Sequence, residues 1–199
     1  MDAMTRAALI TLTQELGLLS TLSIGLKMLI KTLREDPMHV LDPTTEAQEQ
    51  KSREQLRPAV LLYRLLLRMT PRDEALRVTA MVVQSSGRAF LKSVLGDLDL
   101  KTLIDSEERE VLLRKRLQQI PNATFSLRFE GDSLHFTVSA CRFVGLCHAL
   151  GHPELAALFC SVDDAFFGHD LQGVTLHRET TIAQGGHHCP FVFTLHKED

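Results

Sequence analysis

The sequence predicts an α+β fold, with N-terminal helices packed on a small antiparallel sheet of about four strands. Apolar residues recur every three or four positions through residue 120, which is the period of amphipathic helices. Beyond residue 121 the period falls to two, which is typical of strands with one buried face. Two hairpins with short helices between them are expected to share one sheet, because a lone hairpin is only marginally stable.

Length and composition limit the class of protein. The 199 residues fit a single domain over residues 1–199, helical over residues 1–120 and α+β over residues 121–199. The net charge is -3, charged residues make up 24% of the chain and Trp is absent. This composition gives no electrostatic or stacking basis for binding nucleic acid or an anionic membrane.

The N-terminal region is rich in leucine, yet it lacks the pattern of a membrane or export segment. Residues 7–33 contain Gln14, Glu15, Lys27 and Lys31, whereas a transmembrane helix needs ~20 mostly apolar residues. A secretory signal would need a basic start, an uninterrupted apolar run and a cleavage site. All four cysteines lie at or beyond position 141 without zinc-finger or disulfide-scaffold spacing, so we expect reduced thiols in the cytoplasm.

Residues 3–35 are expected to form one helix. Its leucines and one isoleucine follow alternating steps of three and four, interrupted at Ser23: Leu9, Leu12, Leu16, Leu19, Leu26, Ile30 and Leu33. Such a heptad stripe either packs on the helix's own domain or pairs with a second copy in a homodimer. Gly17 and Gly25 lower the helix propensity and mark candidate kinks.

The middle of the chain predicts two further helices. Prolines and a polar run make residues 36–55 a linker, or a loop that leads into a helix. That helix covers residues 53–69 and is apolar nearly all round, which indicates burial. The next covers residues 73–95, where Ala80 and Gly87 permit close approach of another helix.

The pattern changes from helix to strand near Pro121. Asp105 and Glu108 form a capping box for a fourth helix, which Pro121 ends. Strict alternation then predicts a hairpin that turns at Gly131-Asp132. Its apolar positions are Phe125, Leu127, Phe129, Leu134, Phe136 and Val138.

The last third of the chain predicts two short helices and a second hairpin. The first helix covers residues 143–150, and Pro153 suits the first turn of the second. Residues 174–183 and 188–196 alternate as strands, with a glycine pair at their turn.

Reactive groups concentrate between residues 160 and 193. On a helix, Cys160 and Asp163 are spaced i, i+3 and share a face at the margin of the core. Cys189 faces the core side of its strand, because it alternates with the phenylalanines that follow. If helix and hairpin pack together, two thiols and a carboxylate meet. The alternative for each cysteine is simple burial as a small apolar residue, and nothing opposes it for Cys147.

Arg178 shares the parity of apolar neighbours, so its charge lies on an apolar face and needs an anion. That anion is either Asp163 or a substrate carboxylate held by the two-pronged guanidinium. Thr181 has the opposite parity, so a bulge is required if both residues contact a ligand. A carboxylate beside a thiol disfavours the thiolate, which suits Asp163 to moving protons or binding a cationic amidine.

His187 and His188 flank Cys189, and either is a candidate general base near neutral pH. Adjacent residues of a strand point in opposite directions, so at most one of them faces the site. A histidine with Cys141, Cys160 and Cys189 would also make a zinc shell. No Cys-x-x-Cys pair supports that interpretation, so we expect neither a metal nor a cofactor.

These residues fall in the order Cys141 … Cys160-x-x-Asp163 … Arg178-x-x-Thr181-x-x-x-Gly185-x-x-x-Cys189-x-Phe191. Over roughly residues 141–193 this order resembles the L-2-amino-thiazoline-4-carboxylic acid hydrolase family, whereas the first 120 residues match only in being helical. The resemblance implies a hydrolase that opens a small cyclic amidine at a carbon–nitrogen bond. Pro190 stands where an acidic residue commonly follows the last cysteine of the family.

The candidate residues form two groups. The catalytic candidates are Cys160, Asp163, Cys189 and His188. The candidates for binding substrate are Arg178, Thr181, Gly185 and Cys141.

We expect a metal-independent hydrolase, or a related lyase or cyclase, in which Cys160 or Cys189 attacks an electrophilic carbon. Water then resolves the covalent intermediate, and Arg178 holds a carboxylate of the small-molecule substrate. The alternative is a non-catalytic module that binds a ligand or senses oxidants or metals through its thiols. A purely structural partner protein would rest on the N-terminal heptads alone.

Overall fold

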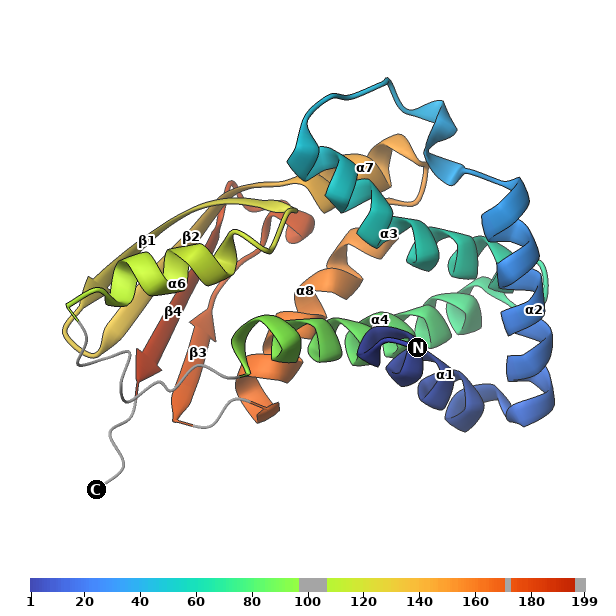
Figure 1. Ribbon diagram of the computed structural model, residues 1–199, viewed down its shortest axis with the longest axis horizontal. Coiled ribbons are helices and arrows are strands. Elements are labelled where there is room, and N and C mark those ends of the chain that lie inside the picture. The colour runs from blue at the N-terminus through green and yellow to red at the C-terminus, as the bar shows by residue number, and fades with distance from the viewer. Residues whose placement is uncertain (97–106, 171–172, 196–199) are drawn as a thin grey trace.

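The computed structural model describes residues 1–96, 107–170 and 173–195, and it combines helices, most of them N-terminal, with a four-stranded antiparallel sheet (Figure 1). The strands are β1 (Ala123–Glu130), β2 (Ser133–Cys141), β3 (Val174–Arg178) and β4 (Cys189–Leu195). They lie in the order β1-β2-β4-β3, and each neighbouring pair is antiparallel. The predicted α+β class is confirmed, and both hairpins share one sheet.

The N-terminal region forms two helices, α1 (Ala3–Leu16) and α2 (Leu18–Arg34), where the sequence predicted one over residues 3–35. They separate at Gly17, whose φ is 80° and ψ is 162°. A positive φ suits glycine because it has no Cβ to clash with the backbone. Gly17 therefore ends the first helix, whereas Gly25, the other candidate kink, lies within α2.

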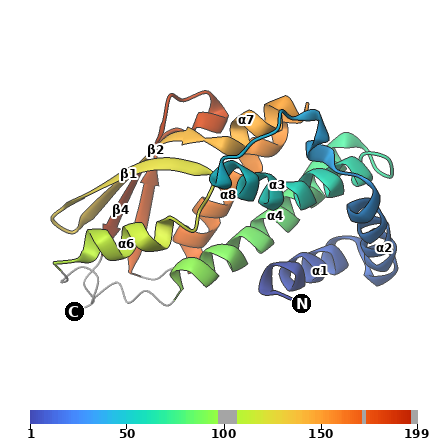
Figure 2. The same cartoon turned by 45° about the horizontal axis from the view of Figure 1, so that its top comes forward.

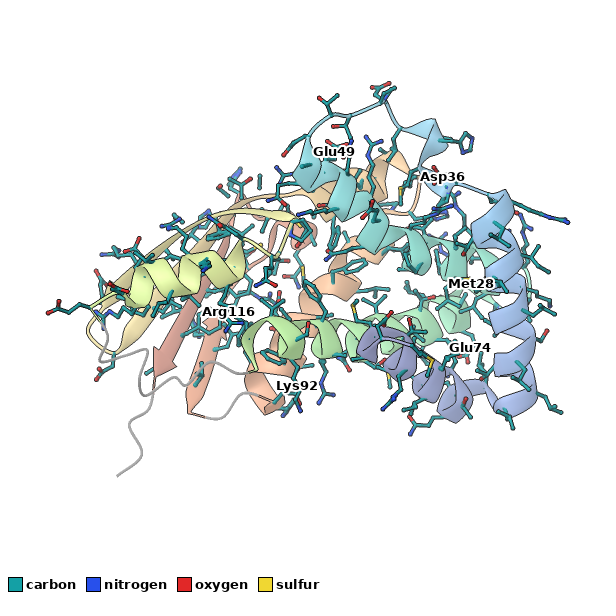
Figure 3. All side chains as sticks on the ribbon, viewed as in Figure 1. Met28, Asp36, Glu49, Glu74, Lys92 and Arg116 are labelled. Atoms are coloured by element: carbon teal, nitrogen blue, oxygen red, sulfur yellow. The ribbon has the colours of Figure 1, made fainter. Side chains whose placement is uncertain are left out.

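The break at Gly17 divides the predicted heptad stripe into two parts. In α1 the stripe packs inward, and Leu12 is buried in the core. In α2 it faces solvent, where Leu19 is 83% exposed. The large apolar side chains exposed on α2 are Leu18, Leu19, Leu22, Leu26, Leu29, Ile30 and Leu33. The inward side of α2 carries the buried Ile24 and the half-buried Met28, which is labelled in Figure 3.

Pairing of α2 with α2 of a second copy stays a prediction, and it can be tested by mutation. Exposed leucines at 19, 22, 26, 29 and 33 keep the three-and-four spacing of a two-stranded coiled coil. The double change Leu22→Glu with Leu29→Glu would place charges in that seam. It should convert a dimer to a monomer in sedimentation equilibrium, with little loss of folding stability because both positions are exposed.

A matched double variant, Ser20→Glu with Lys27→Glu, changes exposed residues of α2 outside the leucine spacing and should leave the dimer intact. A wild-type protein that sediments as a monomer at every concentration would exclude this pairing.

The next two helices supply half of the buried residues of the first core cluster. After a 3-10 turn (Pro37–Val40), α3 (Ala47–Leu66) begins within the segment predicted as a linker or a loop, six residues before the expected start at Arg53. The C-terminal half of α3 is buried nearly all round, as its apolar sequence predicts. The fourth helix, α4 (Arg72–Leu95), matches the range predicted for it.

The remaining helices lie beside the sheet. α6 (Arg109–Leu117) precedes β1, and Asp105 of the predicted capping box lies outside the described residues. α7 (Arg142–Ala149) follows β2 at once and agrees with the predicted short helix. A 3-10 turn (Pro153–Leu155) then leads into α8 (Ala156–Ala165), and a π-helical turn (Phe166–Asp170) follows.

The helices α4, α6 and α8 all lie on the same side of the sheet (Figures 1 and 2). That face carries the buried side chains of Leu127, Val138 and Phe193, in the alternation that the sequence predicts. The opposite face carries exposed polar residues such as Ser126 and Ser139. The second core cluster therefore lies between the sheet and these helices.

The second hairpin is wider than predicted. Strand β3 ends at Arg178, and the chain leaves the sheet before it forms a 3-10 turn (Ile182–Gln184). The predicted strand over residues 174–183 with a tight glycine turn is therefore wrong. The cause is local: Thr181 Oγ1 accepts a hydrogen bond from the backbone N–H of Gln184 at 3.2 Å, and Gly185 adopts a φ of 91°.

Gly87 allows α4 and α8 to approach closely, as the sequence predicts. A Cβ atom at this position would lie 2.6 Å from Cγ2 of Val162, which belongs to the site-bearing helix α8. Gly87→Ala should therefore destabilise the protein by about 1–3 kcal/mol, because α8 must shift. Urea unfolding would measure this change in the free energy of unfolding.

Gly25→Ala is the matched control, since nothing lies within 4 Å of a Cβ built there. It should instead stabilise the helix by roughly 0.5–1 kcal/mol. Equal effects of the two changes would show that contact with Val162 does not limit Gly87.

Candidate active site

One arginine joins α8 to the sheet at the predicted site. Arg178 Nη1 lies 3.1 Å from Asp163 Oδ2, and Arg178 Nη2 donates to the carbonyl oxygen of Cys160 at 3.0 Å. The arginine side chain is only 6% exposed, as its parity in β3 predicts. The buried guanidinium thus finds its anion in Asp163, which was one of the two predicted partners. It also fixes the end of β3 against the helix that carries the thiol.

A second carboxylate, which no sequence pattern singled out, also binds Arg178. Arg178 Nη2 lies 2.7 and 2.8 Å from the two carboxyl oxygens of Asp164. The guanidinium carbon lies 4.9 Å from the ring centroid of Phe191 on β4, a cation–π arrangement. The cluster of Asp163, Asp164 and Arg178 carries one negative charge in excess when both carboxyls are ionised. A substrate carboxylate would have to displace one of these aspartates.

The Asp163 carboxyl is tuned to titrate near neutral pH. Burial raises the pKa of Asp163 to about 7, with a further contribution from the charge of Asp164, while the Arg178 guanidinium opposes the rise. The Asp163 side chain is 29% exposed, and the residue lines a cavity. Near pH 7 this carboxyl therefore exists in both protonation states and can accept or give a proton at the cavity.

The Cys160 thiol is strongly held in its neutral form. Burial, followed by the charge of Asp163, raises the pKa of Cys160 to about 11. An interaction with the Thr181 side chain and the charge of Arg178 lower this pKa and oppose the rise. If a proton passed from the thiol to Asp163, the charge that disfavours the thiolate would disappear, so the two groups are suited to exchange a proton.

The Cys189 thiol lies on the sheet side of the same site. Its Sγ accepts a hydrogen bond from the backbone N–H of Ile182 at 3.2 Å. Burial raises the pKa of Cys189, and this hydrogen bond opposes the rise. Cys141, at the end of β2, lines the same cavity as Cys160 and Cys189. No disulfide joins any of the four cysteines.

The loop between β3 and β4 lies next to the site and contacts Cys189. Thr181 is 2% exposed and donates from Oγ1 to Gln184 Oε1 at 3.0 Å. The predicted need for a bulge does not arise, because the chain has already left the strand at Thr181. Gly185 closes the turn that presents Ile182 to Cys189, and its backbone N–H donates to the Ile182 carbonyl. No pattern in the sequence signals the contact between Ile182 and the thiol.

The two histidines that precede Cys189 lie outside the cavity. His187 and His188 are both exposed, and neither is among the residues that line the cavity. A role for His188 as general base stays a prediction. Among the described residues, Asp163 is the carboxyl that combines a place on the cavity with a pKa near neutral.

Five of the eight candidate residues line one cavity of about 780 Å³: Cys141, Cys160, Asp163, Arg178 and Cys189. Thr181 and Gly185 support it from the adjoining loop, and His188 lies at the surface. Over the residues that the structure describes, no three His, Cys, Asp or Glu side chains are arranged to hold a metal ion, so the predicted alternative of a zinc shell is not assembled. In the same residues, no helix combines the length and apolarity needed to cross a bilayer.

A family model described as L-2-amino-thiazoline-4-carboxylic acid hydrolase matches residues 50–193. The match runs from α3 to β4 and is wider than the resemblance over residues 141–193. Among solved structures, the chain is similar to a mutant H-NOX protein from S. oneidensis in the Fe(II) ligation state. The identity is 14%, the match covers 100% of this chain and 98% of that one, and the TM-score is 0.44. No curated protein matches.

Proposed function

Because the chain belongs to the L-2-amino-thiazoline-4-carboxylic acid hydrolase family, we propose that it is a cysteine-dependent hydrolase. It acts on a carbon–nitrogen bond of a cyclic amidine or amide-like head group. The observation that carries the proposal is the pair formed by the Cys160 thiol and the Asp163 carboxyl, whose pKa is about 7, on one cavity. A nucleophile beside a group that can take its proton is the usual arrangement for covalent catalysis.

Cys160 is the favoured nucleophile. It is half-buried and lines the cavity next to Asp163, whereas the Cys189 side chain is buried and its sulfur already accepts the Ile182 N–H. Cys189 and Cys141 then form the wall around the reacting carbon. Arg178 keeps Asp163 in place through their ion pair and anchors Cys160 through its carbonyl oxygen.

The reaction then proceeds in two steps, and in each step Asp163 takes up one proton and gives it back. Asp163 takes the thiol proton of Cys160 as sulfur adds to the amidine carbon, and it gives that proton to the departing nitrogen as the carbon–nitrogen bond breaks. Water next attacks the carbon bound to sulfur, Asp163 takes a proton from the water, and Cys160 leaves and regains that proton. The net change is addition of one water molecule across the broken bond.

The excess negative charge of the site favours a cationic head group. An amidinium near Asp163 would restore charge balance with Asp164 and Arg178, whereas a free carboxylate would add to the imbalance. Binding of a substrate carboxylate by Arg178 therefore stays a prediction that requires one aspartate to move away.

The first test is a hydrolysis assay with 2-amino-thiazoline-4-carboxylate, followed by mass spectrometry of the protein and of the products. We expect a ring-opened product and a transient adduct on the peptide that contains Cys160. The rate should also show an inflection near the pKa of Asp163, about 7, that Asp163→Asn removes together with roughly 10²–10⁴-fold of the rate. A ring-opened product formed without any thiol adduct, and unaffected by thiol alkylation, would exclude this mechanism.

A thiol-sensing module is the alternative, because Cys141, Cys160 and Cys189 share one cavity. Sensor cysteines usually have a low pKa and an exposed sulfur. The pKa of Cys160 is instead raised to about 11, which is not the pKa of a sensor thiol. Fast loss of free thiols at neutral pH in dilute peroxide, with no turnover, would favour the sensor.

A further inference from the structure

The cavity beside Cys160 is far larger than the head group in the proposed reaction. Its volume is about 780 Å³. At ~30 Å³ for each water-sized group, it has room for roughly 25 such groups. It also lies in the upper part of the range of roughly 300–1,000 Å³ that is common for sites of drug-sized ligands. A small heterocycle at the thiols would leave most of this space unfilled.

The walls away from the thiols are apolar. Phe191 and Phe193 of β4 line the side formed by the sheet, and Val83 and Leu91 of α4 line the opposite side. The second core cluster thus surrounds the cavity instead of closing it. An apolar hollow of this size favours an apolar ligand, because few polar groups are available to hold ordered water.

The polar groups lie at the ends of this apolar region. One end holds the cluster of Cys160, Asp163 and Arg178. Exposed residues of α1 and α3, among them Thr5 and Glu54, also line the cavity and mark its opening to solvent. A ligand with one polar head and an apolar remainder matches this distribution.

The sheet shows how far the apolar region extends from the head site. Arg178 and Val174 lie at opposite ends of β3, share its inner face and both line the cavity. Four residues of strand span about 13 Å. Leu95 at the end of α4 also lines the cavity and belongs to the same core cluster as Val174, and we call the region beside these two residues the distal part of the cavity.

We propose that the substrate joins an amidine- or amide-like head, bound at Cys160 and Asp163, to a long apolar chain or aryl group in this cavity. The inference rests on the proposed function for the identity of the head group alone. The apolar part of the substrate is inferred from the size and lining of the cavity, independently of the reaction. According to this inference, free 2-amino-thiazoline-4-carboxylate is not the best substrate, since that molecule has no apolar extension.

The test is binding of linear alkyl amidines, from acetamidine to decanamidine, to the wild-type protein by isothermal titration calorimetry. Each methylene that enters the cavity should tighten binding about three- to fourfold. Affinity that does not depend on chain length would overturn the inference.

Two variants that fill the distal part of the cavity locate the effect. Val174→Phe and Leu95→Phe enlarge side chains on opposite walls, and each should weaken binding of decanamidine at least tenfold and flatten the dependence on chain length. Val192→Phe is the matched control, because Val192 is half-buried and its parity places it on the outer face of the same sheet. Thermal unfolding of each variant checks its fold, and an equal loss in Val192→Phe would overturn the assignment to this cavity.

The outcomes separate this inference from the proposed reaction. Binding that depends on chain length, in a protein that never forms a Cys160 adduct, supports the apolar site and rejects the hydrolase. Adduct formation and turnover with binding that ignores chain length support the hydrolase and reject the apolar substrate.

Discussion

Cys160→Ser should lower kcat by roughly 10³-fold or more, which is the range seen when a catalytic nucleophile is removed. A serine hydroxyl is a much weaker acid than a thiol, so Asp163, with a pKa of about 7, cannot prepare it for attack. The substitution is nearly isosteric, and the Arg178 contact to residue 160 uses the backbone carbonyl. Substrate affinity, measured by calorimetry, should therefore change little while turnover is lost.

Two further cysteine variants serve as comparisons. Cys147→Ala should leave kcat unchanged, because Cys147 is fully buried in the first core cluster and does not line the cavity. Cys189→Ser removes a sulfur that accepts the Ile182 N–H, so we expect a smaller loss than for Cys160→Ser. Full activity in the Cys160→Ser, Cys189→Ser double variant would end the thiol mechanism and leave these cysteines as wall residues.

The elements that the sequence predicted well are those with an unambiguous period. The first hairpin was located by the alternation from Phe125 to Val138, and its turn lies at Gly131 as expected. The same alternation placed the Arg178 charge on an apolar face, and the cost of burying a charge required an anion such as Asp163. Gly87 at a helix contact followed from its lack of a side chain.

The features that the sequence did not predict depend on contacts distant in the chain or on the backbone conformation. The loop between β3 and β4 has the alternating sequence of a strand. It forms a 3-10 turn instead because of the Thr181 side-chain cap and the positive φ of Gly185. Asp164 was missed as a partner of Arg178, although its position next to Asp163 made it available. The apolar cavity arises from the spacing between the sheet and α4, which no local pattern encodes.

Arg178→Leu should have the largest effect on folding, a loss of about 3 kcal/mol in the free energy of unfolding at alkaline pH. The variant leaves the Asp163 carboxylate without its buried counter-charge, although the exposure of Asp164 keeps the loss at the lower end of that range. The loss should depend on pH. The pKa of Asp163 is raised from 3.8 to about 7 in the folded protein, so folding retains a proton and stability falls as pH rises between these values. Without Arg178 the folded pKa rises further, and stability continues to fall above pH 7.

Urea unfolding at about pH 5 and about pH 9 should therefore show a small loss at the acidic value and a large loss at the alkaline one. Adding Asp163→Asn to Arg178→Leu should restore most of the alkaline loss, because no charge is then left unpaired at that position. Arg128→Leu is the matched control, since that arginine is 65% exposed on the outer face of the sheet, and it should stay within about 0.5 kcal/mol of wild type. A loss that is equal at both pH values, or that Asp163→Asn fails to restore, would mean that Arg178 stabilises the fold through packing on Phe191 and not through its carboxylate partners.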